Sequence, residues 1–258
     1  MEKPHQNNKQ KATAFSQAVA TLRDWIERSS RIVFFGGAGV STESGIPDFR
    51  SEDGLYRQTY DYPPETILSD QFFYSHTEEF YRFYRDKMLC PNTQPNDAHQ
   101  RLALLERRGK LLSVITQNID GLHQKAGSRR VLELHGSIWR NRCLRCGKEY
   151  TLEHIAESAG VPHCSCGGII KPEVVLYGEQ LDSGVLQQAV QDLKNADLVI
   201  VGGTSLSVYP AAGLLDYYQG HLALINKSPT SYDSRADLLL PWGIGRVLRA
   251  AVPESLTE

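Results

Sequence analysis

The side chains best suited to catalysis lie in two short segments, T-Q-N-I-D-G-L-H at residues 116–123 and L-E-L-H-G at residues 132–136. His135 ends an apolar run beside a glycine, and an imidazole titrates in the range that suits a general base near neutral pH. Asn118 and Asp120 offer an amide and a carboxylate that could hold a carboxamide or a water. The alternative for this pair is that both side chains cap the helix after the strand. His135 is therefore the candidate base, and the role of the pair stays open.

A glycine-rich turn earlier in the chain predicts a nucleotide site. The sequence G-G-A-G-V-S-T-E-S-G-I-P-D-F-R at residues 36–50 directly follows the apolar run 31–35. Glycines at the end of a buried strand let the backbone turn sharply, and unpaired backbone N–H groups at such a turn bind phosphate. Ser41 and Thr42 are expected to cap the helical turn that follows. The alternative is a plain glycine-rich connection without a ligand.

The turn differs from the common dinucleotide fingerprint, which is G-x-G-x-x-G after a strand. Gly37 and Gly39 fit this pattern, but Thr42 occupies the third position. Pro47 interrupts the helix that the fingerprint requires. The tail I-P-D-F-R places an aromatic ring and an arginine on a loop that could fold over the ligand.

Four of the five cysteines have the spacing of a zinc site. Cys143 and Cys146 form one close pair, and Cys164 and Cys166 form a second that is one residue shorter than the usual C-x-x-C. A glycine follows each pair and permits the tight turn that a zinc knuckle needs. Four thiolates leave no open coordination position, so the predicted zinc is structural.

Three alternatives to this zinc site stay open from the sequence. His163 could replace one thiolate, the cysteines could form disulfides, or the C-x-x-C could be a redox pair. A reducing cytoplasm disfavours disulfides, and Cys143 does not open a helix after a strand as a redox pair would. Cys90 is left over and is expected to be a buried or free thiol.

Composition restricts the class of protein. The chain has 258 residues and a formal net charge of -2, which gives no basis for nucleic-acid binding. No apolar run approaches the ~18 residues that a membrane span needs. Residues 1–11 are polar and lack the apolar core of a signal peptide, so we expect them to be disordered and the protein to be cytoplasmic.

Apolar runs that alternate with helical patterns indicate a parallel sheet with helices on both faces. Buried strands are predicted at residues 31–35, 111–116, 131–134, 198–201 and 222–225. Helices are predicted at residues 13–29, 98–108 and 186–195. Two segments fall outside the alternation. Residues 55–89 are rich in aromatics and are expected to form a small helical insert with its own core, and residues 141–171 carry the paired cysteines.

Polar residues gather at one end of these strands. They are Gly36–Gly39, Gln117–Asp120, His135–Gly136, Gly202–Ser205 and Asn226. Ligands of open α/β sheets bind outside the carboxyl ends of the strands. A core strand needs no polar residue at that end, so we expect one shared site there.

These segments and two further ones follow one another along the chain. The order is G-A-G-V-S-T-E-S-G-I-P-D-F-R, T-Q-N-I-D-G-L-H, E-L-H-G-S, the paired cysteines, K-P-E-V-V-L-Y-G-E and G-G-T-S-L-S-V-Y-P-A-A. In this order the chain resembles the sirtuins, the NAD-dependent protein deacylases, over residues 12–250. No motif is decisive alone, but their shared order makes the resemblance specific.

The resemblance implies a Rossmann-like large domain and a small domain made of two insertions. The large domain would comprise residues 12–54, 96–140 and 172–258. The small domain would comprise the helical insert 55–95 and the zinc-binding ribbon 141–171. NAD and an acyl-lysine peptide would meet in the cleft between the two domains.

The resemblance also assigns residues to the NAD site and to the peptide. The NAD site would be formed by Ala38, Thr42, Phe49, Arg50, Gln117, Ile119, Asp120, His135, Thr204, Ser205, Asn226, Gly243 and Ile244. The peptide would add as a strand between Val175–Gly178 and Ser207–Tyr209, contacting Val175, Tyr177, Gly178, Ser207 and Val208. Within the NAD site, Phe49 would cover the nicotinamide ribose and Asp120 would help hold the nicotinamide amide.

The same resemblance implies a reaction. The acyl oxygen of the substrate lysine would attack the ribose carbon that bears nicotinamide, and nicotinamide would depart. His135 would then draw a proton from the ribose hydroxyls so that the 2′-oxygen attacks the resulting imidate, while Asn118 orients the reacting groups. Hydrolysis would leave free lysine and acylated ADP-ribose, so we expect a protein-lysine deacetylase.

Two departures from the sirtuin pattern bear on the acyl group. Tyr177 stands where most relatives carry Phe, which adds a hydroxyl near the acyl-lysine channel. Relatives that prefer acidic acyl groups carry Tyr-x-x-Arg, whereas here Tyr81 precedes Tyr84 by three residues and Arg85 by four. A shift of one helical position turns a side chain by about 100°. We expect acetyl or short apolar acyl groups, with Arg85 leaving an acidic group open.

Two other functions use some of the same residues. An NAD-dependent oxidoreductase would use the glycine-rich turn and His135, but Asn118 and Asp120 favour cleavage of the cofactor. A zinc-ribbon interaction module would use the cysteines, but the chain lacks the basic excess of a nucleic-acid binder. The expected partners are acyl-lysine proteins, without nucleic acid or membrane, and the expected oligomeric state is a monomer.

Overall fold

A computed structural model describes residues 4–49, 54–55 and 61–254. In these parts of the chain, six parallel strands form one sheet in the order β3-β2-β1-β7-β8-β9. The strands are β1 (Ile32–Gly36), β2 (Leu111–Thr116), β3 (Val131–Glu133), β7 (Leu198–Gly202), β8 (His221–Ile225) and β9 (Leu238–Leu240). The five strands predicted from apolar runs are confirmed. β9 was not predicted because its run of three leucines is too short to show a period.

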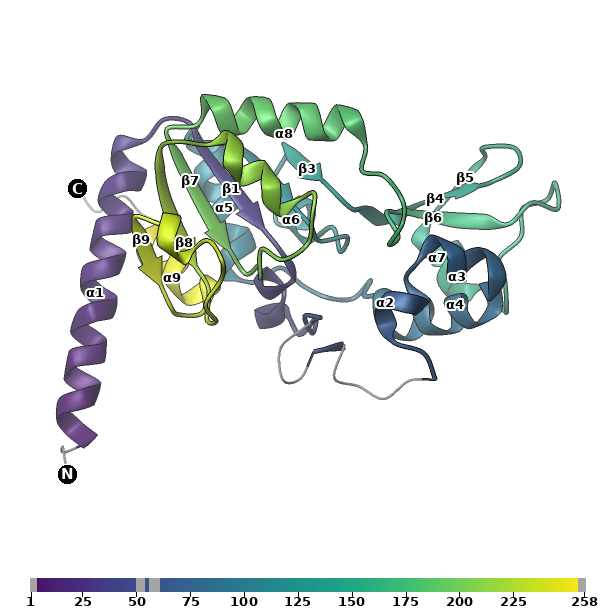
Figure 1. The fold of residues 1–258 in the computed structure, drawn as a ribbon, viewed down its shortest axis with the longest axis horizontal. Helices are drawn as coiled ribbons and strands as arrows, with labels where there is room; N and C mark the ends of the chain where they lie inside the picture. Colours follow the sequence, from purple (N-terminus) through teal and green to yellow (C-terminus); the bar gives the residue numbers. More distant parts are fainter. Residues whose placement is uncertain (1–3, 50–53, 56–60, 255–258) are drawn as a thin grey trace.

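Helices cover both faces of this sheet, as the alternating pattern predicted (Figure 1). One face packs against α1 (Pro4–Arg28), α5 (Asp97–Arg107) and α9 (Ile244–Ala251). The other face packs against α8 (Ser183–Asn195) and the 3₁₀ segment η5 (Ala212–Tyr217). The sheet is therefore the middle layer of a doubly wound α/β structure.

The N-terminal helix is longer than its apolar spacing predicted. α1 begins at Pro4, so the expectation of disorder over residues 1–11 is wrong for residues 4–11, while residues 1–3 lie outside the described part. Proline suits the first position of a helix, and no glycine or further proline follows before residue 28. The polar sequence indicated exposure, but it did not exclude a helix whose backbone continues beyond the sheet (Figure 1).

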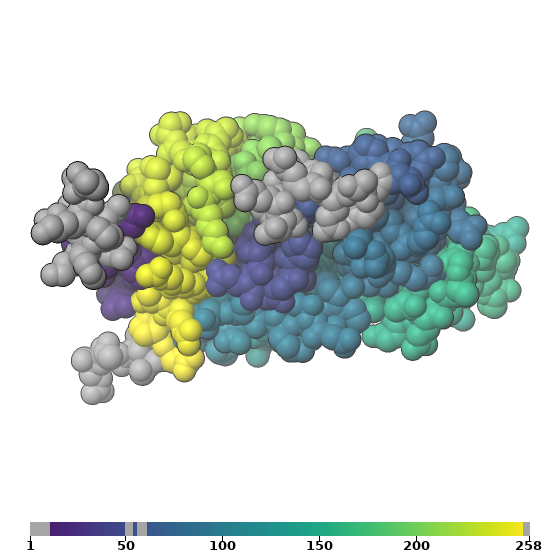
Figure 2. Space-filling model, turned by 90° about the horizontal axis from the view of Figure 1, so that it is seen from below, coloured from purple at the N-terminus to yellow at the C-terminus, as the bar shows by residue number. Residues whose placement is uncertain are grey.

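The two segments outside the alternation form a second body. The helical insert contains α2 (Pro64–Ile67), α3 (Asp70–Ser75), α4 (Thr77–Phe83) and the π-helical turn η4 (Tyr84–Met88). The cysteine segment contributes to an antiparallel sheet of β5 (Glu149–Tyr150), β4 (Gly136–Cys143) and β6 (Ile170–Val174), with α7 (Leu152–Glu157). Figure 2 shows the two segments side by side, far from α1.

The aromatic core of the helical insert is present, but the cysteine segment shares it. Phe73, Phe80, Tyr81 and Tyr84 are fully buried in one cluster with residues of β4, α7 and β6. The Tyr81 hydroxyl donates to the carbonyl of Ile170. The two inserts therefore stabilise each other, because neither encloses the aromatic cluster alone.

A glycine holds β4 against β6 next to the candidate base. Gly136 has φ +75°, and a Cβ there would lie 1.9 Å from the carbonyl oxygen of Glu173. Only glycine allows this approach. His135 is thereby fixed at the junction between β3 of the large sheet and β4 of the small one.

We predict that Gly136→Ala destabilises the protein by more than about 2 kcal/mol, since a left-handed conformation and a backbone clash act together. Gly109→Ala is the matched control, because Gly109 has φ +71° and a Cβ there would meet nothing within 4 Å. The control should cost about 1 kcal/mol. Chemical unfolding measures both, and equal losses would contradict the importance of the contact with Glu173.

Candidate functional site

The carboxyl ends of the parallel strands open into one cleft of about 460 Å³ that reaches the helical insert. Most of the residues predicted for the site line it: Ala38, Phe49, Gln117, Asn118, Ile119, Asp120, His135, Val175, Tyr177, Gly178, Thr204, Ser205, Val208 and Asn226. The clustering of polar strand ends thus corresponds to a real cavity, bounded on its far side by Tyr84 and Met88 of η4.

The other predicted site residues lie elsewhere. The Thr42 hydroxyl donates to the carbonyl of Gly39 at 3.0 Å, within the glycine-rich loop. Ser207 is exposed and its hydroxyl lies 2.8 Å from that of Ser205. Ile244 is buried in the core of the large sheet, so its side chain points away from solvent. Gly243 is the residue before α9, and Arg50 lies outside the described residues.

The glycine-rich loop is pressed against the loop after β7. The Gly39 N–H donates to the Gly203 carbonyl at 2.8 Å, and a Cβ on Gly39 would lie 2.8 Å from the Cα of Gly203. The loop contains two short 3₁₀ turns, η1 (Ala38–Val40) and η2 (Thr42–Ser44), in place of a longer helix. The glycines therefore serve close packing between two strand ends, which places both loops on the cleft.

Ser41 occupies the N-cap position of η2, but neither its side chain nor that of Thr42 makes a capping hydrogen bond, so the predicted capping is wrong. The fully buried Ser41 hydroxyl instead donates to Oδ2 of Asp120 at 2.6 Å and accepts from Nδ2 of Asn118 at 3.1 Å. This pairing joins positions far apart in the sequence, which local capping rules cannot show. Ser41 is thus a residue of the site that the sequence reasoning missed.

Asp120 has two structural partners in this network. Its Oδ1 accepts from the backbone N–H of Leu122 at 2.9 Å, at the first residue of α6 (Leu122–Lys125), whose N-cap position is Gly121. Asp120 thus supports the start of the helix, as the capping alternative expected in part, and it also belongs to the Ser41 network. Burial raises the pKa of Asp120, and the hydrogen bonds from Ser41 and Leu122 oppose that effect. Asn118 does not share this role, since its side-chain amide donates to Ser41.

His135 is held in one tautomer by the loop after β2. Its Nδ1 lies 3.0 Å from the carbonyl oxygen of Gln117, which can only accept, so Nδ1 carries the proton. Nε2 is then the atom that can take up a proton. Burial lowers the pKa of His135, and the bond to Gln117 partly opposes this. The imidazole is therefore neutral near pH 7, as a general base requires.

Gln117 also joins the loop after β2 to the loop after β7. Its Nε2 donates to the hydroxyl oxygen of Thr204 at 3.0 Å, and the same oxygen accepts from the N–H of Leu206 at 3.2 Å. Gln117 thus contacts His135 through its carbonyl and Thr204 through its amide. One residue therefore fixes the position of the candidate base relative to the far side of the cleft.

The segment predicted to pair with a peptide already uses much of its backbone. Val175 donates to the carbonyl of His135 at 2.9 Å, Leu176 to the Glu179 carboxylate at 2.8 Å, and Tyr177 to the carbonyl of Leu68 at 2.9 Å. The carbonyls of Leu176 and Tyr177 also accept, from the N–H groups of Glu179 and Asp70. A peptide strand would therefore pair mainly at the two ends of this segment, through the backbone groups of Val175 and Gly178. The hydrogen-bond pattern of strand addition is restricted accordingly.

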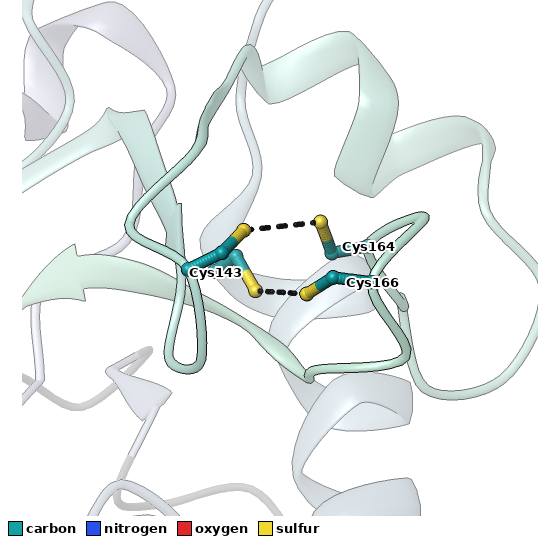
Figure 3. Close-up of side chains that lie close together, drawn as sticks. Cys143, Cys164 and Cys166 are labelled. Carbon is teal, nitrogen blue, oxygen red and sulfur yellow. Dashed lines mark hydrogen bonds between the residues drawn. The ribbon is translucent and has the colours of Figure 1, made fainter.

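The four paired cysteines converge from two hairpins, and Figure 3 shows Cys143 facing Cys164 and Cys166. The Sγ atoms of Cys143 and Cys166 are 3.5 Å apart, those of Cys146 and Cys164 are 3.6 Å apart, and all four lie within 4.8 Å of one another. A tetrahedron with Zn–S bonds of about 2.3 Å has edges of about 3.8 Å. The donor set therefore fits a structural zinc ion.

The alternatives to four thiolates do not fit this geometry. The sulfur separations are far longer than the ~2.05 Å of a disulfide. Nδ1 of His163 lies 2.7 Å from the carbonyl oxygen of Val161, and His163 is outside the cluster. Cys90, the leftover thiol, lines the cleft, and burial raises its pKa to about 11.

Arg85 is engaged between the two inserts. Its guanidinium donates to the carbonyl of Ile155 at 2.9 Å, to the hydroxyl of Ser158 at 2.9 Å and to the carbonyl of Gly160 at 2.5 Å. Arg85 is absent from the residues that line the cleft within the described chain. Its guanidinium is thus directed to the zinc-binding segment and not to the cleft.

The helices described here include none with both the length and the apolar character needed to cross a bilayer.

A model of the Sir2 family matches residues 37–210. The NAD-dependent protein deacetylase of Clostridium acetobutylicum is 56% identical over 239 residues, which cover 91% of this chain and 98% of the relative. The enzyme of the same name from Cutibacterium acnes is 55% identical over 232 residues, which cover 89% of this chain and 95% of that relative.

Solved structures give the same result. A Sir2 protein with a deacetylated p53 peptide and 3′-O-acetyl ADP-ribose is 40% identical, with a TM-score of 0.85 over 92% of this chain and 98% of that one. A Sir2 complex with a p53 peptide and NAD⁺ is 42% identical, with a TM-score of 0.79 over 88% of this chain and 93% of that one.

We predict that Cys146→Ser abolishes zinc binding and lowers the melting temperature, because three thiolates cannot close the tetrahedron that joins the hairpins. Cys90→Ser is the matched control and should keep both the metal and the melting temperature. Metal analysis measures the zinc content of each variant, and thermal unfolding measures its melting temperature. Full zinc content in Cys146→Ser would exclude the four-cysteine site.

Proposed function

Because this chain belongs to the Sir2 family, we propose that it is an NAD-dependent protein-lysine deacetylase that transfers the acyl group to ADP-ribose and releases nicotinamide. One observation carries this proposal for the site. A neutral, tautomerically fixed His135 lines the same cleft as the buried Ser41–Asn118–Asp120 network. The relatives named above are deacetylases, which sets the oxidoreductase and interaction-module alternatives aside.

The cleft residues divide into those that hold NAD and those that move a proton. Bound NAD supplies a ribose carbon whose nicotinamide is a leaving group. Ala38, Thr42, Phe49, Arg50, Gln117, Ile119 and Asp120 would hold the nicotinamide riboside end. Thr204, Ser205, Asn226, Gly243 and Ile244 would hold the adenosine end, with Ile244 acting through its backbone because its side chain is in the core.

His135 would act as the base through Nε2. The carbonyl of Gln117 holds the ring by Nδ1–H, and it stabilises the cation that forms when Nε2 takes a proton from a ribose hydroxyl. Asn118 would orient the reacting groups, since its amide is fixed by Ser41. Phe49 is partly buried against the aromatic core and lines the cleft, and from there it would keep water from the activated ribose.

The acyl group would be acetyl or a short apolar chain. The part of the cleft nearest the helical insert is lined by Leu68, Tyr84, Met88, Ile119 and Val174. No guanidinium lies among the described lining residues, because Arg85 is engaged with the zinc-binding segment. Lys87 also lines the cleft, but its ammonium is paired with the Asp86 carboxylate at 2.9 Å. An acidic acyl group among these apolar side chains would thus lack a countercharge of its own, which is costly.

Several finer expectations belong to this proposal. The protein substrates carry acyl-lysine, and the peptide strand would use Val175, Tyr177, Gly178, Ser207 and Val208. We also propose a cytoplasmic location, a monomeric state, and a large domain separate from a small domain of residues 55–95 and 141–171. The zinc ion held by the four cysteines would be structural, joining two hairpins away from the cleft.

We predict that the purified protein releases free nicotinamide from NAD only when an acetyl-lysine peptide is present. His135→Ala should lower the rate by at least about 100-fold, since general base catalysis contributes typically about 10²–10⁴-fold. Mass spectrometry of the products and a melting curve of the variant provide the measurement. Reduced cofactor among the products, or full activity of a folded His135→Ala variant, would contradict the assignment.

We predict that the acid limb of the kcat/KM profile lies below pH 6.5. The lowered pKa keeps His135 neutral as the pH falls through its ordinary value of 6.5, and the base is lost only at lower pH. An NMR titration of the His135 ring in the free protein separates its protonation from that of Asp120. A ring pKa above 6.5 would contradict the effect of burial.

A further inference from the structure

A second concave surface lies between α8 and η5. Figure 1 shows α8 on the face of the large sheet opposite α1. The cavity of this surface is about 720 Å³. Leu186 and Val190 of α8 are half-buried along one wall, and Tyr217, 51% exposed, stands at the end of η5. An open groove with apolar walls is a surface on which an apolar side chain of a partner gains by leaving water.

This α8–η5 groove adjoins the candidate active-site cleft. Tyr209 and Pro210 line both cavities, and Tyr209 is 68% exposed. The Tyr209 ring packs across Gly213 of η5, where a Cβ would lie 3.5 Å from the ring. A chain that leaves the cleft over Tyr209 therefore enters the groove directly.

The dimensions of the groove suit a short extended segment. The groove extends along α8 from Leu186 to Asn195, and nine helical rises of about 1.5 Å span about 14 Å. An extended peptide advances about 3.3 Å per residue, so roughly four residues would fill the groove.

The charges at the groove favour an acidic group on the occupant. Nζ of Lys194 lies 5.4 Å from the centroid of the Tyr217 ring, at the end of the groove away from Leu186. No carboxylate is found among the described residues that line the groove. The nearby carboxylate of Asp216 is paired with Arg235 at 2.5 Å. A carboxylate placed beside Lys194 would thus meet a positive charge.

We propose that the α8–η5 groove extends the substrate-binding surface and takes a flanking segment of the acyl-lysine protein, with an apolar side chain against Leu186 and Val190 and a carboxylate at Lys194. The proposal rests on the function proposed above, since it places the acyl-lysine in the adjoining cleft. It identifies substrates by an apolar–acidic segment several residues from the modified lysine.

The test compares acetyl-lysine peptides that share one core of two residues on either side of the lysine. Extended peptides carry six further residues with Phe and Asp, on the amino or the carboxyl side, and control peptides carry Ser and Lys at those two positions. The Phe–Asp extension on one side of the lysine should lower KM by about tenfold, compared with the core peptide and with the control peptide. This is the gain in affinity expected when one large apolar side chain is buried.

Variants of the groove residues test whether the groove causes this decrease in KM. Val190→Glu and Tyr217→Ala should each abolish the lower KM of the extended peptide, while kcat and KM for the core peptide stay unchanged. Gln188→Glu, an exposed position of the same helix outside the groove, should retain it. Lys194→Glu should transfer the preference from Asp to Lys in the extension.

Other outcomes overturn the proposal. Equal KM for extended and control peptides, or retention of the gain in both Val190→Glu and Tyr217→Ala, excludes the groove as a substrate site. A dimer of the wild-type protein that Val190→Glu dissociates would assign the groove to a second copy of the chain. If the core peptide itself is not deacetylated, the proposed function fails, and fluorescence anisotropy of labelled extended and control peptides still tests the groove.

Discussion

The site depends on one buried hydrogen bond, between the Ser41 hydroxyl and the Asp120 carboxylate. A carboxylate in the interior is costly unless donors surround it, and here a serine and the start of α6 supply them. The same serine accepts from Asn118, so three polar side chains from two separate loops share one network. This pairing fixes the glycine-rich loop after β1 against the loop after β2, and the second loop holds His135 through Gln117. This bond therefore holds the cofactor loop beside the base, together with the backbone bond from the Gln117 N–H to the Gly36 carbonyl at 3.0 Å.

Much of the fold could be predicted because its signals are local. Strands such as β7 are continuous apolar runs that end at a glycine, and parallel order follows from their alternation with helices. The zinc site could be predicted for the same reason, since the spacing within each cysteine pair is a local property and the sulfurs then meet across two hairpins. The cleft itself was predictable because carboxyl ends of parallel strands share one edge.

The features that could not be predicted depend on contacts between distant segments. Ser41 looks like a helix cap in the sequence, and only the fold places it beside Asp120. Arg85 looks like a candidate ligand for acidic groups, yet it donates to carbonyls 70 and 75 positions away in the zinc-binding segment. Similarly, the sequence indicates a self-contained aromatic cluster in the helical insert, but β4 and β6 complete it. Tertiary packing determines the partners of these side chains, and local sequence patterns do not predict those partners.

The most direct measurement of the central interaction is the rate of nicotinamide release by Ser41→Ala in the presence of saturating acetyl-lysine peptide. Removing a buried hydrogen bond to a charged group costs about 1.5–3 kcal/mol, which corresponds to a rate at least about tenfold lower if that energy positions the cofactor loop. Ser44→Ala, in the same loop but outside the Asp120 network, should retain most of the activity. A folded Ser41→Ala variant with the wild-type rate would show that the network does not organise the site.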